Sequence, residues 1–224
     1  MRLAMLGNRG VPARWGGSDT AVEEIGARLV ARGHQVVVYC RRHNSNTSDR
    51  YYKGMERVVL PSPKIKSADT LAHSLLSIFH VVLHNKADVL HFSGVGNSWL
   101  LPLLRLFPAK RSVVTIDGPD WTRPKWGKTA RWMLRESVPL MVRFADAIIS
   151  DNVLIRQWIQ DQYHRDSFLV FYGADQRLRR ETDILDQYDL QPRRYLMCSG
   201  VLTPDKGQHI AIEAFEGLAT DPIA

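Results

Sequence analysis

Cysteine is scarce in this sequence: Cys40 and Cys198 are the only two among 224 residues. They stand too far apart to provide a metal-ligand spacing or a disulfide framework, and we expect two small buried thiols. Long apolar runs are missing as well. The densest stretches, residues 75–83 and 99–107, contain polar residues and fall far short of the roughly 18–20 apolar residues of a membrane span. The apolar run at the start is too short for a signal peptide, so we expect a cytoplasmic protein.

Acidic residues are fewer than basic ones, 23 against 30, which gives a formal net charge of +7 and a pI near 9.6. Most of the excess lies in residues 105–143, which contain nine lysines and arginines and three acidic residues. Basic surfaces attract nucleic acid, phosphorylated substrates or membranes. Here Lys128, Arg131 and Arg135 share one helical face with Trp132 at its edge. Such a face is most often only solvated, although it also suits peripheral contact with an anionic membrane.

The remaining composition is ordinary, with 45% hydrophobic and 24% charged residues, which excludes a disordered or fibrous chain. Short apolar runs alternate with segments of helical periodicity, a pattern typical of parallel βαβ units. We therefore predict an α/β fold with a Rossmann-like, parallel, doubly wound sheet. The predicted strands are residues 2–6, 35–40, 57–60, 88–92, 111–116, 147–150 and 168–171, and the predicted helices are residues 18–32, 68–85, 98–107, 128–145 and 153–162.

The alternation stops after residue 171, which predicts a domain boundary. Residues 1–171 form the first predicted domain, and the polar residues 172–193 form a connector with at most one short helix. A second cycle begins in residues 194–224, with a predicted strand at residues 195–200 and a predicted helix at residues 208–218. One strand and one helix cannot bury a core of their own. We therefore expect the second Rossmann-like domain to be truncated.

The predicted helix at residues 18–32 carries Val22, Ile25 and Leu29 on one face. Thr20 and Glu23 have the spacing of a capping box, in which each side chain satisfies a backbone N–H of the first turn. We expect the apolar face to pack on the sheet and the two polar residues to close the start of the helix.

The loop of residues 7–17 follows the first predicted strand and is long and rich in glycine. Glycines let the backbone approach a ligand closely, and the N–H groups of the following helix favour a diphosphate or a sugar. The spacing differs from the dinucleotide fingerprint, and Arg41 and Arg42 stand where nicotinamide-binding proteins have an acidic residue. A nicotinamide-dependent enzyme is therefore disfavoured, and an ordinary loop with turn glycines stays the structural alternative. Arg14 and Trp15 are the candidates for sugar contact in this loop.

Two further loops follow predicted parallel strands, whose carboxyl ends form the usual ligand-binding edge of α/β folds. Residues 91–97 offer His91 and Asn97, although a lone histidine at a strand end is more often structural. Residues 117–127 follow the strongest strand and combine carboxylates, indoles and cationic side chains, which suit sugar hydroxyls and rings. The candidates in this loop are Asp117, Asp120, Trp121 and Arg123. We predict that all three loops meet at one edge of the sheet.

Together these segments resemble the retaining family 4 glycosyltransferases of the two-domain GT-B type, and in particular a bacterial rhamnosyltransferase-like subgroup. The resemblance covers nearly the whole chain and rests on residues 9–17, 117–127, 144–150 and 200–215. It implies transfer of a sugar from a nucleotide-diphospho-sugar to a glycan or lipid-linked acceptor in polysaccharide biosynthesis. It also implies that the N-terminal domain binds the acceptor and the C-terminal domain binds the donor.

The same resemblance implies roles for individual residues. Gly16 and Gly17 match the glycine pair that approaches the donor diphosphate, and Lys206 matches the family's phosphate-binding lysine. It implies no metal and no cofactor, because cationic side chains and a helix N-terminus neutralise the departing diphosphate. Asp117 is the catalytic candidate, as an orienting carboxylate or as a base, and capping of its own loop is the structural alternative. Val201 stands where the family has an arginine, which removes half of the usual basic clamp.

The paired glutamates of the family's donor domain have no counterpart within these 224 residues. We therefore expect little or no transferase activity from this chain by itself. A basic binding module without catalysis, or an inactive fragment, is the main alternative. Salt-dependent binding to any polyanion without an effect of nucleotide-sugars supports that alternative. We expect no nucleic-acid partner, and a location in the cytoplasm or peripherally at the inner face of the cytoplasmic membrane.

Overall fold

The computed structural model describes residues 1–14, 16–45, 48–64, 69–124, 126–174, 183–200 and 202–218. The chain divides into two compact units, Met1–Gly173 and Ala174–Ala224, and each unit is described by itself. Among the described helices, none is both long enough and apolar enough to cross a bilayer.

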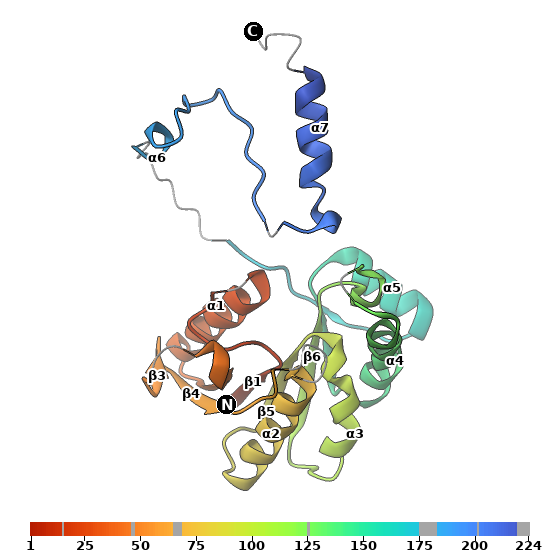
Figure 1. The fold of residues 1–224 in the computed structure, drawn as a ribbon. Helices are drawn as coiled ribbons and strands as arrows, with labels where there is room; N and C mark the ends of the chain where they lie inside the picture. The colour runs from red at the N-terminus through yellow and green to blue at the C-terminus, as the bar shows by residue number, and fades with distance from the viewer. Residues whose placement is uncertain are drawn as a thin grey trace. The chain divides into compact units, whose positions relative to one another are not determined.

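The first unit is built on one sheet, with eight strands in its described residues (Figure 1). Their order is β3-β4-β2-β1-β5-β6-β7-β8, and every pair is parallel except the β3–β4 hairpin. The strands are β1 (Arg2–Leu6), β2 (Gln35–Arg41), β3 (Tyr51–Tyr52), β4 (Met55–Leu60), β5 (Val89–Ser93), β6 (Arg111–Ile116), β7 (Ala147–Ser150) and β8 (Phe168–Leu169). The predicted parallel sheet is confirmed. The order reverses between β1 and β5, and such a switch point is where α/β sheets bind ligands.

Helices cover the two faces of this sheet. Helix α1 (Gly17–Ala31) packs on one face, where Val22 joins Met5 and Val38 in a buried cluster. The other face is covered by α2 (Asp69–Leu83), α3 (Leu101–Leu104), α4 (Lys128–Phe144) and α5 (Val153–Tyr163). Their inner residues bury Leu90 and Phe92, whose side chains alternate with those that face α1. The doubly wound architecture is therefore also confirmed.

Several elements differ from their predicted form. The helix predicted at residues 98–107 is a 3₁₀ helix, η2 (Val95–Leu100), followed by the single turn of α3. The predicted last strand, residues 168–171, pairs only over Phe168–Leu169. The hairpin strand β3 was not predicted, because two residues are too short to show a period. The turn between β3 and β4 is Lys53-Gly54, with φ of 48° and 77°, as a tight hairpin turn requires.

The start of α1 also differs from its prediction. The capping-box prediction for Thr20 and Glu23 is wrong, because Gly16 is the N-cap and makes no side-chain capping bond. The buried residues of this helix include Asp19 and Glu23 beside Val22, whereas Ile25 is 40% exposed. The buried face of α1 is therefore rotated relative to the predicted apolar face, because these carboxylates have backbone partners in the loop before the helix.

The second unit contains α6 (Asp183–Asp186), the 3₁₀ helix η4 (Pro204–Lys206) and α7 (Gln208–Leu218) in its described residues. The predicted helix at residues 208–218 is confirmed. The strand predicted at residues 195–200 is wrong, because these residues pair with no strand in the described part of the chain. An isolated strand leaves its backbone N–H and C=O groups without partners. Cys198 is accordingly exposed, against the prediction, whereas Cys40 is buried as predicted.

Candidate functional site

The loops after β1, β5 and β6 meet at the carboxyl edge of the sheet, as predicted, because these strands are parallel neighbours. Gly7 shows how closely they approach. A Cβ atom at this position would lie 2.7 Å from the carbonyl oxygen of Ser93 and would overlap the side chain of Asn97. With φ of 85°, the position also has a backbone conformation that favours glycine. Glycine at residue 7 therefore permits the contact between the first two loops.

Two carboxylates on the inward face of α1 hold the first loop by its backbone. An oxygen of Asp19 accepts a hydrogen bond from the N–H of Arg9 at 3.1 Å. An oxygen of Glu23 accepts one from the N–H of Ala13 at 2.6 Å. Both carboxylates are buried, so each satisfies a backbone donor that the glycine-rich loop cannot satisfy itself.

The second oxygen of Glu23 connects the loop to the β3–β4 hairpin. It accepts a hydrogen bond from the hydroxyl of Tyr52 at 3.1 Å and lies 2.7 Å from the ammonium of Lys53. Burial by itself pushes the pKa of Glu23 upward, but the bonds from Ala13, Lys53 and Tyr52 outweigh it and hold the pKa below its ordinary value. The carboxylate is therefore held ionised in the folded protein.

Two arginines of the sheet complete the support of this loop. The Nε of Arg57 donates to the carbonyl oxygen of Val11 at 2.9 Å. Arg41, at the end of β2, lies 2.7 Å from the carboxylate of Asp69 and donates to the carbonyl oxygen of Gly7 at 3.4 Å. Burial lowers the pKa of Arg41, and its partner Asp69 opposes that shift. Arg41 therefore has a structural role at the end of β2. The sequence analysis had used this residue only as an argument against nicotinamide binding, because an acidic residue is expected there.

A cavity of about 210 Å³ lies where the three loops meet the inner side of α4. Its walls combine the backbone of glycines in the first two loops with two indoles and with polar side chains of the second and third loops. They include Gly7, Gly94, Asn97, Trp99, Asp120 and Trp126. The glycines leave the strand ends accessible, while the indoles offer the apolar faces on which sugar rings stack.

A larger open groove of about 830 Å³ lies beside this cavity, between the third loop, α4 and α5. Trp121 and Trp158 lie side by side in it, with ring centroids 5.4 Å apart. Arg123, also in the groove, forms an ion pair of 3.1 Å with Asp120. The groove therefore brings three of the predicted residues together, Asp117, Trp121 and Arg123.

Asp117 directly follows β6, and Asp151 follows the neighbouring strand β7. Burial raises the pKa of Asp151, and the charge of Asp117 raises it further. Burial likewise raises the pKa of Tyr172 to about 12, with both carboxylates contributing. Asp117 and Asp151 therefore form an acidic pair at one strand edge. The sequence analysis missed Asp151, although its place directly after a predicted parallel strand was the available signal.

Other predicted residues lie elsewhere. Gly16 and Gly17 are exposed at the start of α1, with nothing near a Cβ added at either, and Arg14 is exposed beside them. Trp15 lies outside the described residues. Lys206 belongs to the second unit, where it is exposed at the end of η4.

The side chains of His91 and Asn97 form hydrogen bonds within the first unit. The Nε2 of His91 is 2.7 Å from the hydroxyl of Thr115, and burial lowers the pKa of His91 to about 4. The amide of Asn97 donates to the carbonyl oxygen of Ser93 and accepts from Ser74, at 2.9 and 2.7 Å. Both side chains thus hold strands and loops in place, and contact of His91 with an acceptor stays a prediction. Within the described residues, no three His, Cys, Asp or Glu side chains gather as a metal site would require.

An α/β sheet with a ligand crevice at its switch point defines a broad class of nucleotide- and sugar-binding folds. The glycosyl transferase 4-like domain matches residues 16–168, and the chain belongs to this family. No curated protein matches.

Solved structures are similar in fold. An Anabaena protein, Alr3699/HepE, in complex with UDP-glucose aligns with a TM-score of 0.68 at 16% identity, over 96% of this chain and 57% of that one. Sucrose-phosphate synthase from Thermosynechococcus elongatus aligns with a TM-score of 0.59 at 15% identity, over 84% of this chain and 52% of that one. The chain thus spans little more than half the length of these proteins.

Proposed function

We propose that this chain is the acceptor-binding part of a nucleotide-sugar-dependent glycosyltransferase of the GT-B type. The observation that carries the proposal is the family match over the first unit, in which the three loops line a cavity and the third loop lines a groove with α4 and α5. The similar Anabaena structure contains UDP-glucose, which supports a nucleoside diphosphate sugar as donor. We further propose a retaining reaction of the bacterial rhamnosyltransferase-like type, with a glycan or lipid-linked acceptor of polysaccharide biosynthesis.

Asp117 is the residue that we place at the acceptor hydroxyl. It lies in the groove beside Trp121 and Arg123, and among the described residues nothing hydrogen-bonds its carboxylate. A carboxylate with free acceptor capacity binds sugar hydroxyls, and the indole beside it covers the apolar face of a ring. We assign Asp117 an orienting role, with proton removal from the attacking hydroxyl as the second possibility.

The donor side of the proposal rests on the exposed start of α1. Gly16 and Gly17 leave open space there, and a helix of 15 residues directs its first N–H groups and its positive end toward this space. A diphosphate suits that environment without a metal ion. We include Lys206 as a further phosphate contact. The described part of the second unit contains no sheet, so we expect the chain by itself to transfer little sugar.

Saturation-transfer NMR on the purified chain tests the proposal without requiring turnover. Oligosaccharide acceptors and nucleotide-sugars are offered in turn, and we expect saturation of acceptor ring protons. Asp117→Asn keeps the shape and removes the charge, so it is expected to weaken the acceptor signal. Asp161→Asn, at an exposed position on α5, is the matched control and is expected to change nothing.

Two results contradict the proposal. Equal acceptor signals in Asp117→Asn and the parent would make Asp117 a structural residue. Salt-dependent binding to heparin or DNA, with no saturation of any sugar, would favour the basic binding module instead.

A further inference from the structure

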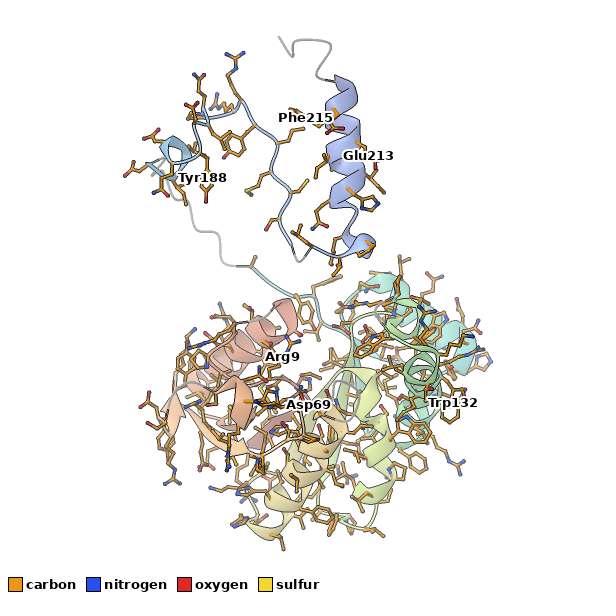
Figure 2. All side chains as sticks on the ribbon, in the orientation of Figure 1. Arg9, Asp69, Trp132, Tyr188, Glu213 and Phe215 are labelled. Atoms are coloured by element: carbon orange, nitrogen blue, oxygen red, sulfur yellow. The ribbon has the colours of Figure 1, made fainter. Side chains whose placement is uncertain are left out.

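The groove that contains Asp117 also contains a guanidinium without an acidic partner. Arg135, an exposed residue of α4, lines this groove and forms no ion pair with the described residues. The second arginine of the groove, Arg123, is compensated by Asp120 at 3.1 Å. The groove lies between α4 and α5, on the side of the first unit where Trp132 of α4 is labelled in Figure 2. Among the described residues of the groove, Arg135 is therefore the cation that can pair with a ligand.

Three aromatic side chains line the same groove in succession. The ring centroid of Trp121, in the third loop, is 5.4 Å from that of Trp158 on α5. The ring of Trp158 is in turn 5.6 Å from that of Tyr163, the last residue of α5. All three side chains are half-buried and pack against the core, which holds them in place. Because an aromatic face can cover the apolar face of one sugar ring, the succession of three favours an acceptor with more than one sugar unit.

The two opposite charges of the groove, on Asp117 and Arg135, act on different neighbours. Burial raises the pKa of Asp151, and the charge of Asp117 adds to this shift. Burial also raises the pKa of Tyr163, where the charge of Arg135 opposes the shift and that of Glu136 adds to it. Glu136 is not part of the groove lining, so a ligand in the groove meets the guanidinium and not this carboxylate. The groove therefore has a carboxylate at the end of β6 and a guanidinium near the end of α5.

We propose that the acceptor is an acidic glycan, and that Arg135 binds the carboxylate or phosphate of one sugar unit while a hydroxyl of another lies at Asp117. A guanidinium matches either oxyanion through two parallel N–H bonds. Asp117 repels an anionic group at its own end of the groove, so the two charges together fix the direction in which the glycan lies. The inference rests on the proposed function and specifies the chemical class of its acceptor.

Titration of the purified chain, followed by saturation-transfer NMR, tests this inference with defined probes. The probes are disaccharides of glucose or of galactose in three matched forms: neutral, with one ring oxidised to the uronic acid, and with a phosphate on that ring. We expect at least one acidic form to bind about fivefold more tightly than its neutral counterpart, which is the upper range for an exposed ion pair. The acidic form that binds more tightly identifies the oxyanion that Arg135 recognises.

Substitutions of two arginines on α4 separate recognition in the groove from general attraction by charge. Arg135→Gln removes the guanidinium, and we expect it to lower the affinity for the acidic forms to that for the neutral form. Arg135→Lys keeps the charge without the planar fork and should retain part of the preference. Arg143→Gln is the matched control, because Arg143 is an exposed arginine of the same helix that does not line the groove. This control should keep the full preference, and circular dichroism verifies that every variant is folded.

Two results would overturn this inference and leave the proposed function in place. The first is equal affinity of the parent chain for acidic and neutral disaccharides, with binding that Asp117→Asn weakens. The second is an equal loss of the acidic preference in Arg135→Gln and Arg143→Gln, because this would assign the preference to the net charge of the chain. A chain that binds none of the disaccharides contradicts the proposed function itself, and the assignment of Arg135 then fails with it.

Discussion

Replacing Glu23 by Gln removes one charge and one acceptor oxygen from the inward face of α1. The carboxylate accepts bonds from the N–H of Ala13 at 2.6 Å and the hydroxyl of Tyr52 at 3.1 Å, and it pairs with Lys53 at 2.7 Å. An amide has a single acceptor oxygen, so it cannot serve the loop and the hairpin at once. The variant leaves a buried donor without a partner or releases the hairpin.

Hydrogen bonds to a charged group contribute about 1.5–3 kcal/mol each, so we expect the free energy of unfolding to fall by about 2 kcal/mol. For a unit of this size, 1 kcal/mol corresponds to about 2–4 °C, which gives a drop in Tm of about 4–8 °C. The sign with pH follows from the lowered pKa of Glu23. Its contribution is fully present above the pKa of the unfolded chain and is lost as pH falls through the folded-state value.

Urea denaturation followed by circular dichroism and calorimetry measures both quantities. Glu24→Gln is a matched control, because Glu24 is the next residue and pairs with Lys53 and Arg28 at the surface. Exposed pairs of this kind contribute little. If the two variants are equally stable, Glu23 does not fasten the loop and the reasoning from burial is wrong.

Two other perturbations test the edge of the sheet. Gly7→Ala places a Cβ atom against the carbonyl oxygen of Ser93 at a positive φ, so we expect the free energy of unfolding to fall by about 3 kcal/mol in urea denaturation. Wild-type stability of this variant would show that the two loops can separate without penalty. Burial and the charge of Arg41 lower the pKa of His73 to about 4, so this residue stabilises the fold above the unfolded pKa and loses its contribution as pH falls. Between pH 7.5 and 5 the free energy of unfolding should fall by about 2 kcal/mol because of His73. We expect His73→Gln to remove this pH dependence and His209→Gln, at an exposed position, to retain it. An unchanged pH dependence in His73→Gln would refute the assignment to His73.

The sheet was predictable because its central strands are buried on both faces. The short, mostly apolar strands β6 and β7 were predicted with the observed bounds, Arg111–Ile116 and Ala147–Ser150. The meeting of the three loops followed from parallel order alone. Asp117, Trp121 and Arg123 were likewise found in one groove because they belong to one loop.

What the sequence did not reveal depends on contacts between distant residues. Glu23 was predicted to close a capping box with Thr20, and Asp19 was not singled out, because polar residues on a helix usually point outward. Their burial follows from the backbone donors of Arg9 and Ala13, whose positions only the folded loop provides. The binding of His91 to Thr115 arises in the same way, between neighbouring strands 24 residues apart.

In the first loop, the residues that fix the backbone conformation differ from the residue that exposes its side chain. Side chains of α1 and the sheet form hydrogen bonds with main-chain atoms of the loop at Gly7, Arg9, Val11 and Ala13. The path is thus encoded by side chains of α1 and the sheet, whereas Arg14 is exposed and forms no hydrogen bond or ion pair with the described residues. Substitutions at such a position change the exposed side chain without changing the position of the backbone that carries it. Under the proposed function, libraries that aim to change the acceptor can therefore vary Arg14 while Asp19, Glu23, Arg41 and Arg57 are kept.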